Sequence, residues 1–164
     1  MQVLENINEK VIEFAEKSGA EQAESFIING RMINTYVDGD SVNIITNNKW
    51  VGIGLKIVMD KRIGFISGIY QNTESIENLV TKGIKLAKMS PRNEKFESLP
   101  EPKQISGVIK DVYDESLERI TPEELSNYAE RVIHSAQENE EKVMNGLIRI
   151  NLFEFNVMNS LGVN

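Results

Sequence analysis

The sequence predicts an α+β fold, an antiparallel β-meander sheet with amphipathic helices packed on one face. Runs rich in β-branched and aromatic residues follow one another over residues 26–70, and the short connections between them favour antiparallel pairing. Apolar residues at helical spacing occur before and after these runs, over 3–18, 76–87 and 125–136. Each such helix can bury its apolar side against one face of the sheet.

The first predicted helix covers residues 3–18. Its apolar residues recur on one side at the helical period: Val3, Leu4, Ile7, Val11, Phe14 and Ala15. Gly19 follows as a natural stop, because glycine readily adopts the left-handed conformation that ends many helices.

Hairpin signals divide the first half of the meander. Asn29-Gly30 and Asp38-Gly39 lie between β-rich runs, and both dipeptides favour the type I′ turn, whose two central residues need a positive φ. We therefore expect a strand over 26–28, a turn at Asn29-Gly30, a strand over 32–37 and a second turn at Asp38-Gly39.

The second half of the meander is predicted from three further runs. A strand over 42–46 is expected to end at the polar residues 47–49, and a strand over 50–58 to turn through 59–62. Residues 63–70 then run back, which makes about five consecutive strands in all.

A second helix and a long connection are predicted after the meander. Residues 76–87 keep the helical spacing, and lysines gather toward the C-terminal end, where positive charge complements the helix dipole. Residues 90–110 contain three prolines and are typical of a long surface connection. Residues 1–164 are expected to form one domain, and an internal boundary, if present, would fall within 90–110.

The third helix has the strongest local signature. Thr121 can cap its start, Pro122 suits the first helical position and Glu124 completes a capping box. Its predicted apolar face consists of Leu125, Tyr128, Ala129, Val132, Ile133 and Ala136. A last hairpin is predicted over 142–157, with Asn145-Gly146 as its turn.

Composition argues against several classes of function. Apolar residues make up 40% and charged residues 26%, which is ordinary for a soluble globular protein. The net charge of −7 argues against direct nucleic-acid binding, which needs clustered Lys and Arg. No run is long enough to span a membrane and no secretory signal is evident, so a cytoplasmic location is expected. With no cysteine and one histidine, the chain lacks the usual ligands of a zinc site.

Three motifs are explained better by structure than by chemistry. Gly52-Ile53-Gly54 lacks the third glycine and the following helix of a dinucleotide site, so we expect glycines of a bent or closely crossed sheet. The acidic pairs Glu123-Glu124 and Glu140-Glu141 flank a helix start and a hairpin, where capping and solvation account for them. His134 lies beside the apolar face of the third helix, where a lone histidine is typically a packed or half-exposed side chain. The sequence therefore predicts no catalytic residue, cofactor-binding residue or metal ligand.

Four residues on or beside the predicted strands are candidates for substrate or domain contact: Trp50, Lys56, Arg62 and Tyr70. An exposed aromatic residue accompanied by a cation can mark a contact with a peptide or another domain. The alternative is that Trp50 packs in the core and the other three are solvated strand ends.

The order of several short strings resembles the N-terminal region of the TldD/PmbA family. Members of that family begin with a helix that runs into GAxxAE, here residues 19–24. A GxGxR/K strand and a GF strand follow, here residues 52–56 and 64–65. A helix that ends in AxxS-P and a later NSxG turn complete the set, here residues 87–91 and 159–162. The ordered set covers nearly the whole chain.

The resemblance implies more than the chain contains. TldD-type members are zinc metalloproteases with an HExxxH helix downstream of the matched region, whereas PmbA-type members, also called TldE, lack the zinc motif and act as the partner subunit. The family is associated with processing of peptide antibiotics, degradation of an antitoxin and an older designation as modulator of DNA gyrase. This sequence has no HExxxH, so the resemblance carries over no catalytic or metal residue. Zinc would belong to a C-terminal domain of a TldD-type parent.

Two functions from different classes follow. The first is the non-catalytic N-terminal domain of a TldD/PmbA metalloprotease or of its inactive partner, which would shape the peptide-substrate cavity and the dimer interface. The chain would then be a fragment whose reading frame continues past Asn164. Because uncovered apolar surface favours association, we expect a homo-oligomer or a complex with a TldD/PmbA-type partner subunit. The alternative is a stand-alone peptide- or protein-binding module that uses an exposed strand edge.

Overall fold

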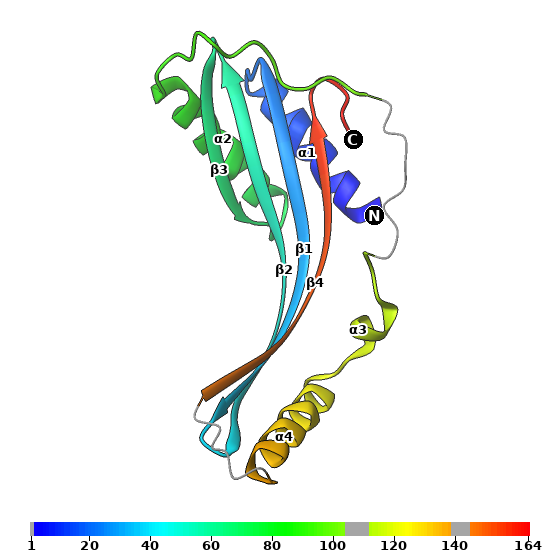
Figure 1. The fold of residues 1–164 in the computed structure, drawn as a ribbon. Coiled ribbons are helices and arrows are strands. Elements are labelled where there is room, and N and C mark those ends of the chain that lie inside the picture. The colour runs from blue at the N-terminus through cyan, green and yellow to red at the C-terminus, as the bar shows by residue number, and fades with distance from the viewer. Residues whose placement is uncertain (1, 104–111, 139–144) are drawn as a thin grey trace. The chain divides into compact units, whose positions relative to one another are not determined.

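The computed structural model describes residues 2–103, 112–138 and 145–164, and it confirms the α+β class (Figure 1). Four strands form an antiparallel sheet in the order β3-β2-β1-β4. The elements are α1 (Gln2–Lys17), β1 (Gln22–Asp38), β2 (Ser41–Met59), β3 (Arg62–Ile69), α2 (Thr73–Met89), α3 (Glu115–Arg119), α4 (Pro122–Glu138) and β4 (Asn145–Asn159). No helix within the described residues is long and apolar enough to cross a membrane.

The chain divides into two compact units. Unit 1 consists of Met1–Asn29, Trp50–Ser106 and Glu154–Asn164, and unit 2 consists of Gly30–Lys49 and Gly107–Phe153. Strands β1, β2 and β4 each contribute residues to both units, and each unit has a hydrophobic core of its own. The predicted boundary region 90–110 lies partly outside the described residues.

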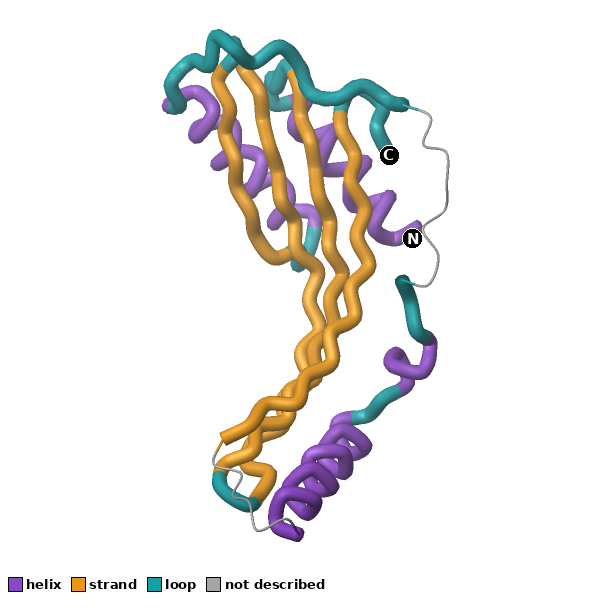
Figure 2. Tube along the Cα trace, in the orientation of Figure 1, coloured by secondary structure: helices purple, strands orange, loops and turns teal. Residues whose placement is uncertain are grey.

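In unit 1 the two long helices α1 and α2 cover one face of the sheet (Figure 2). Helix α2 packs on β3 and against α1. The largest fully buried apolar side chains of this core are Val11, Ile27, Leu55, Ile57, Ile76 and Val80. Both helices therefore present the apolar side that their spacing predicts, except that Val3 is 69% exposed.

Helix α2 and strand β3 approach each other closely at a glycine. A Cβ added to Gly64 would lie 2.5 Å from the backbone N of Ala87 and 2.7 Å from the backbone O of Gly83. These distances are far shorter than any van der Waals contact, so only glycine fits at this position of β3. The GF strand of the sequence is thus the place where the sheet touches helix backbone.

In unit 2 helix α4 packs on the sheet through a narrower apolar strip. Ala129 and Ile133 join Val37 of β1, and Val42 and Ile148 pack against them. The capping box predicted at the start of α4 is confirmed, because the Glu124 backbone N–H donates to Thr121 Oγ1 (3.1 Å) and the Thr121 backbone N–H donates to Glu124 Oε2 (2.8 Å). The predicted apolar face is too wide, since Tyr128 and Val132 are about half exposed.

The short helix α3, which the sequence pattern did not predict, is held to unit 2 by an arginine. Arg31 of β1 donates from its two Nη atoms to the carbonyl oxygens of Glu118 (2.6 Å) and Ile120 (2.9 Å). These carbonyls lie at the C-terminal end of α3, where unpaired carbonyl oxygens favour a cation. The same guanidinium therefore caps the helix and fixes it to the sheet.

Two predicted strand breaks are wrong. Strand β1 continues through Asn29-Gly30 without a turn, and Gly30 does not have a positive φ. Strand β2 likewise continues through residues 47–49. At Asn29-Gly30 strand β1 lies between β2 and β4, and residues 47–49 of β2 lie before the β3 register, which begins at Gly52. Pairing between the long strands therefore outweighs the local turn preference.

The other turn predictions of the meander are confirmed. Strand β1 ends at Asp38-Gly39, where Gly39 has φ +64°. Residues 59–62 join β2 to β3, and both central residues, Asp60 and Lys61, have positive φ (49° and 57°), as a type I′ turn requires. The meander therefore consists of two long strands, β1 and β2, and the eight-residue strand β3, instead of about five short strands.

The predicted last hairpin is replaced by one long strand. Asn145-Gly146 begins β4 and is not a turn, and β4 joins the sheet beside β1. Residues 142–144, the other arm of the predicted hairpin, lie outside the described residues. The NSxG segment follows β4 as a turn, in which the backbone N–H groups of Leu161 (2.9 Å) and Val163 (3.1 Å) donate to Asn159 Oδ1.

Candidate functional site

The candidate site is the face of the unit 1 sheet opposite α1 and α2, here called the open face. Successive side chains of a strand point to opposite faces, and in β2 the side chains of Ile53 and Leu55 are buried in the core that the helices cover. Gly54 and Lys56 therefore lie on the open face. The register of β3 pairs Lys56 with Phe65, which places Phe65 on the open face as well.

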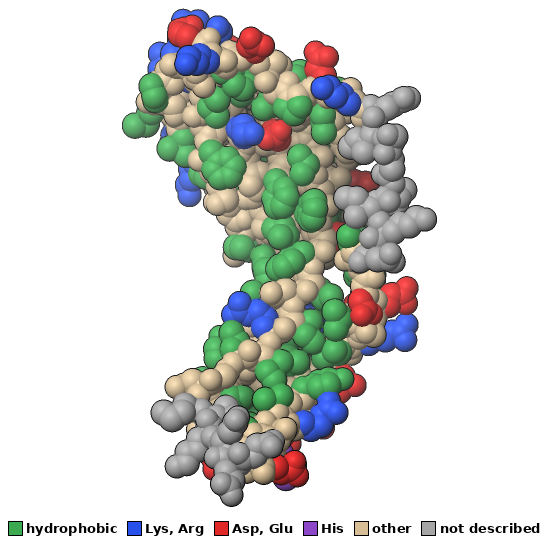
Figure 3. Space-filling view, viewed as in Figure 1, with side chains coloured by type: hydrophobic (Ala, Val, Ile, Leu, Met, Phe, Trp, Pro, Cys, Tyr) green, Lys and Arg blue, Asp and Glu red, His purple; other side chains and the backbone are tan. Residues whose placement is uncertain are grey.

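Aromatic side chains gather on the open face, where Figure 3 shows apolar side chains side by side. The rings of Phe26 and Phe155 stack with a centroid separation of 5.7 Å and an interplanar angle of 25°. Phe65 is 66% exposed, Phe155 65% and Ile69 56%. Contiguous exposed apolar surface of this kind marks a site of contact with another surface.

The two glycines of the GxG motif form the floor of the open face. A Cβ at Gly54 would lie 3.8 Å from Phe26 Cβ and 3.9 Å from Phe65 Cζ, and a Cβ at Gly52 would lie 3.0 Å from Ile28 Cγ2. At Gly52 the Ile28 side chain of β1 therefore approaches closely, whereas a methyl group at Gly54 would make ordinary van der Waals contact. The motif lies within the continuous strand β2, so no helix begins at it.

One ion pair accompanies the aromatic rings. Lys56 of β2 pairs with Glu24 of β1, and the two side chains are 35% and 21% exposed. Pairing neutralises both charges, so the open face presents apolar surface without net charge around this pair. A surface of this kind suits another folded protein surface better than a charged ligand.

The structure does not bring the four candidate contact residues together. Trp50 and Lys56 lie on the open face, with Trp50 Cδ1 4.0 Å from the position of a Cβ at Gly52. Arg62 lies at the other face, where its Nη1 donates to the carbonyl oxygen of Ser90 (2.8 Å) at the end of α2. Tyr70 packs against the core.

The rings that dominate the open face were missed by sequence reasoning. Phe26, Phe65 and Phe155 are far apart in the chain, and each stands on a different strand. The sequence does contain a signal for them, because Phe65 and Ile69 stand at alternating positions of β3 that point to the same face of the sheet. Choosing the exposed parity required knowing which face the helices cover.

The described titratable residues that were considered for catalysis take part in local contacts within helices or at helix ends. His134 is exposed on α4 and lies 3.3 Å from Glu138, measured between Nε2 and Oε1. Glu124 serves the capping box, and Glu140-Glu141 lie outside the described residues. Hydrogen bonding and charge from Lys17 lower the pKa of Glu13, and hydrogen bonds from Ser116 lower the pKa of Asp114, both at exposed helix positions.

The zinc that the family resemblance implies does not fit the residues of this chain. Within the described ranges no group of three or more His, Cys, Asp or Glu side chains could hold a metal ion. A zinc site normally takes three or four such ligands. The described residues therefore offer no donor set for such a site.

Comparison with known proteins gives matches among solved structures. No family model and no curated protein matches the chain. TldE from Thermococcus kodakarensis has a TM-score of 0.82 and 25% identity, over 94% of this chain and 35% of that one. Candidate modulators of DNA gyrase from Thermotoga maritima (TM-score 0.74, 15% identity, 97% and 36% covered) and Bacteroides thetaiotaomicron (0.74, 17%, 94% and 36%) share the fold. The chain spans about a third of the length of each.

Proposed function

We propose that this chain serves as a non-catalytic domain of a TldD/PmbA-type assembly. It docks through its open face onto another protein surface of that assembly. The solved structures confirm the resemblance to the TldD/PmbA family on which this proposal builds. In this role it shapes the cavity that receives a peptide substrate and takes part in the subunit interface. The proposal includes a cytoplasmic location.

The observation that carries the proposal is the composition of the open face. Two helices cover one face of the sheet, and exposed aromatic rings lie on the other face, which remains available for contact with another protein. Burying apolar surface contributes about 25 cal/mol per Å², so rings as exposed as Phe65 and Phe155 gain substantially when a second surface covers them. An apolar face whose Lys56 and Glu24 charges pair with each other fits a protein–protein contact.

The reaction itself is assigned by this proposal to another part of the assembly. The described residues supply no cluster of side chains that could hold a metal ion. In a TldD-type assembly, peptide hydrolysis would take place at zinc held elsewhere, and this domain would contribute walls and contacts. In a PmbA-type assembly it would serve the partner subunit.

The proposal is tested by association of the chain in solution. Wild type is expected to form a dimer or larger oligomer in sedimentation equilibrium, because in isolation the open face can be covered by a second copy. Phe65→Asp should shift the equilibrium toward monomer, because a carboxylate at the interface would be desolvated without a partner. Met89→Asp is the matched control, since Met89 is 82% exposed at the end of α2 and away from the open face.

Two results would contradict docking through the open face. One is a wild-type chain that stays monomeric across the concentration range and also fails to bind TldD- or PmbA-type subunits from its own source. The other is an oligomer that Phe65→Asp and Met89→Asp weaken equally. Circular dichroism of both variants should match wild type, since both side chains are exposed.

A second candidate function rests on the strand order. Strands β3 and β4 form the two edges of the described sheet, and β4 extends over Asn145–Asn159. An edge strand can bind an extended peptide by adding it to the sheet through backbone hydrogen bonds. A stand-alone peptide-binding module would use β4 in this way, and it would remain monomeric.

A further inference from the structure

A chain of polar side chains crosses three strands of unit 2. Asn34 of β1 is 4% exposed, and its Nδ2 donates to Thr46 Oγ1 of β2 (2.9 Å). Arg149 of β4 donates from Nε to Asn34 Oδ1 (2.6 Å). Because Thr46 orients the amide and the amide holds the guanidinium, Arg149 is fixed by a neutral partner and retains its full charge.

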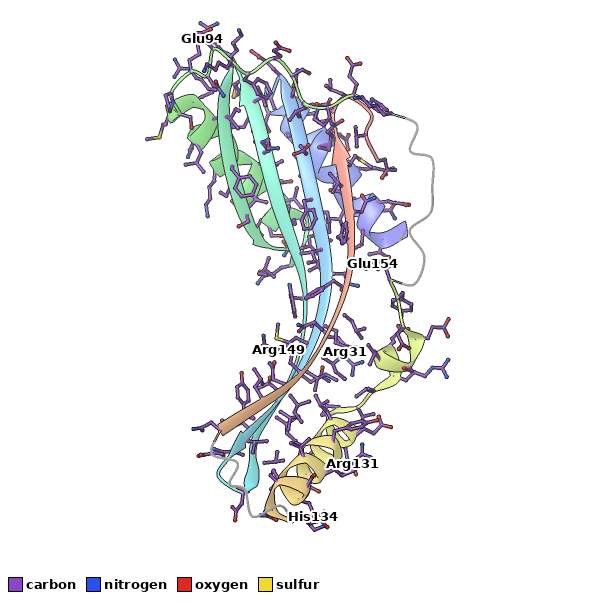
Figure 4. All side chains as sticks on the ribbon, viewed as in Figure 1. Arg31, Glu94, Arg131, His134, Arg149 and Glu154 are labelled. Atoms are coloured by element: carbon purple, nitrogen blue, oxygen red, sulfur yellow. The ribbon has the colours of Figure 1, made fainter. Side chains whose placement is uncertain are left out.

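The side of the sheet that carries Arg149 is opposite α4. Val37 packs against α4, so the even-numbered side chains of β1, including Asn34, point to the other side. Figure 4 shows Arg31 and Arg149 on the two sides of the strands, with Arg31 toward α3. Arg149 is therefore free of both helices of unit 2.

The terminal nitrogens of Arg149 are available for a ligand. Its side chain is exposed, and among the described residues neither Nη1 nor Nη2 has a hydrogen-bond or ion-pair partner. Arg31 is the other arginine in the strands of unit 2, and both of its Nη atoms donate to carbonyl oxygens at the C-terminal end of α3. A guanidinium held at Nε presents a fork that matches the two oxygens of a carboxylate.

Apolar surface lies next to the fixed guanidinium. Leu147 is two residues away on the same face of β4, at a spacing of roughly 7 Å, and it is 46% exposed. Leu147 also lines an open cavity of about 530 Å³ together with Tyr36 and Ile44, which are both exposed. A cation and an apolar hollow are thus placed side by side.

We propose that Arg149 of unit 2, fixed by Asn34 and Thr46, binds the carboxylate of a peptide whose neighbouring apolar side chain enters the cavity lined by Tyr36, Ile44 and Leu147. The carboxylate can come from an acidic side chain or from a free C-terminus, since both present the same pair of oxygens. The proposal rests on the proposed function only in calling this peptide a substrate.

Other anionic ligands fit the site less well. A nucleic acid binds through several cations at once, whereas this site offers one arginine in a chain of net charge −7. The residues that line the cavity include Asp38 and no Lys or Arg that could bind a second phosphate group. A single negative charge attached to an apolar side chain matches both parts of the site.

To test the proposal, the chain is titrated with short N-acetylated peptides, and binding is measured by calorimetry and by changes in amide chemical shifts. Acetyl-Val-Thr-Phe-Glu-amide and acetyl-Val-Thr-Phe with a free carboxylate distinguish the two sources of the carboxylate. Acetyl-Val-Thr-Phe-Gln-amide, which carries no charge, is expected to bind about tenfold more weakly than whichever carboxylate peptide binds best. Binding should weaken as salt is added, because the contact is solvent-accessible.

Variants locate the binding to Arg149. Arg149→Gln should lower affinity for the carboxylate peptides about tenfold and leave the uncharged peptide unaffected. Asn34→Asp should also lower the affinity for the carboxylate peptides, because the new carboxylate would pair with Arg149. This variant keeps the guanidinium in place. Arg131→Gln is the control for net charge, since Arg131 lies over the ring of Tyr128 on α4, 4.3 Å from the centroid.

Several outcomes would overturn the proposal. They are equal affinity of charged and uncharged peptides, an Arg149→Gln variant that binds as wild type does, and shift changes confined to unit 1. Inorganic phosphate that displaces the peptide at equal concentration would overturn the peptide class. Since these titrations use the chain alone, peptide binding can succeed or fail independently of docking through the open face.

Discussion

The two units stabilise their structure by different means. Unit 1 has two long helices over one face of its sheet, a core of many fully buried aliphatic side chains and a glycine where helix and strand backbones touch. Unit 2 has one long helix, a narrow apolar strip and two arginines that make hydrogen bonds to fixed partners. Hydrogen bonds from a fixed arginine, here called polar anchoring, can therefore hold helices and strands in place where the hydrophobic core is too small to do so.

The largest expected effect is in the core of unit 2. Ile133→Asp should lower the free energy of unfolding by about 4 kcal/mol, because it removes a buried side chain and buries an unpaired carboxylate. Val132→Asp, one position away and 56% exposed, should change it little. Chemical denaturation measures both. Equal effects would mean that α4 packs through a wider face than the structure has.

The close approach in unit 1 gives the next effect. Gly64→Ala should cost about 3 kcal/mol, since its Cβ would overlap the backbone of α2 and the helix would have to move away. Gly54→Ala is the matched control on β2, where the nearest atoms are 3.8 Å away. Thermal unfolding of the two variants compares them, and a stable Gly64→Ala variant would contradict backbone contact at this place.

Polar anchoring in unit 2 is tested at Arg31. Arg31→Leu should cost about 2 kcal/mol, because it leaves two carbonyls at the end of α3 without their donors. Amide exchange of residues 115–120 should accelerate most, while exchange in α1 and α2 stays slow. Arg119→Leu removes an arginine that is 82% exposed and should leave exchange in this segment nearly unchanged.

The smallest effect concerns the cap of α3. Hydrogen bonds from Ser116 lower the pKa of Asp114 below its usual 3.8, so the cap stabilises α3 above that pH and is lost as pH falls through the lowered value. The protection of the α3 amides, relative to the exchange of an unstructured chain at the same pH, should therefore fall at acid pH more than in Asp114→Asn, whose cap does not titrate. Identical pH profiles would show that the carboxylate does not hold the helix.

The four candidate contact residues that the sequence suggested lie on different faces of the sheet. Trp50 and Lys56 lie on the open face, whereas Arg62 and Tyr70 lie on the helix side. Trp50, Lys56 and Arg62 stand in strands and Tyr70 directly follows β3, but the face of each side chain depends on strand parity and on which side the helices cover. Arg149 gave no sequence signal at all, because its partners Asn34 and Thr46 are brought to it by pairing of distant strands.

The sequence by itself determined the features whose cause is local. Apolar spacing and capping residues located α1, α2 and α4, and the turns at Asp38-Gly39 and Asp60-Lys61 follow from short-range backbone preferences. The tertiary structure decided the rest. Asn29-Gly30 stays extended because β1 has a paired strand on each side, and the rings of Phe26, Phe65 and Phe155 share one face because register unites three strands. Strand pairing is non-local, so its energy can override a local turn signal and no short window of sequence contains it.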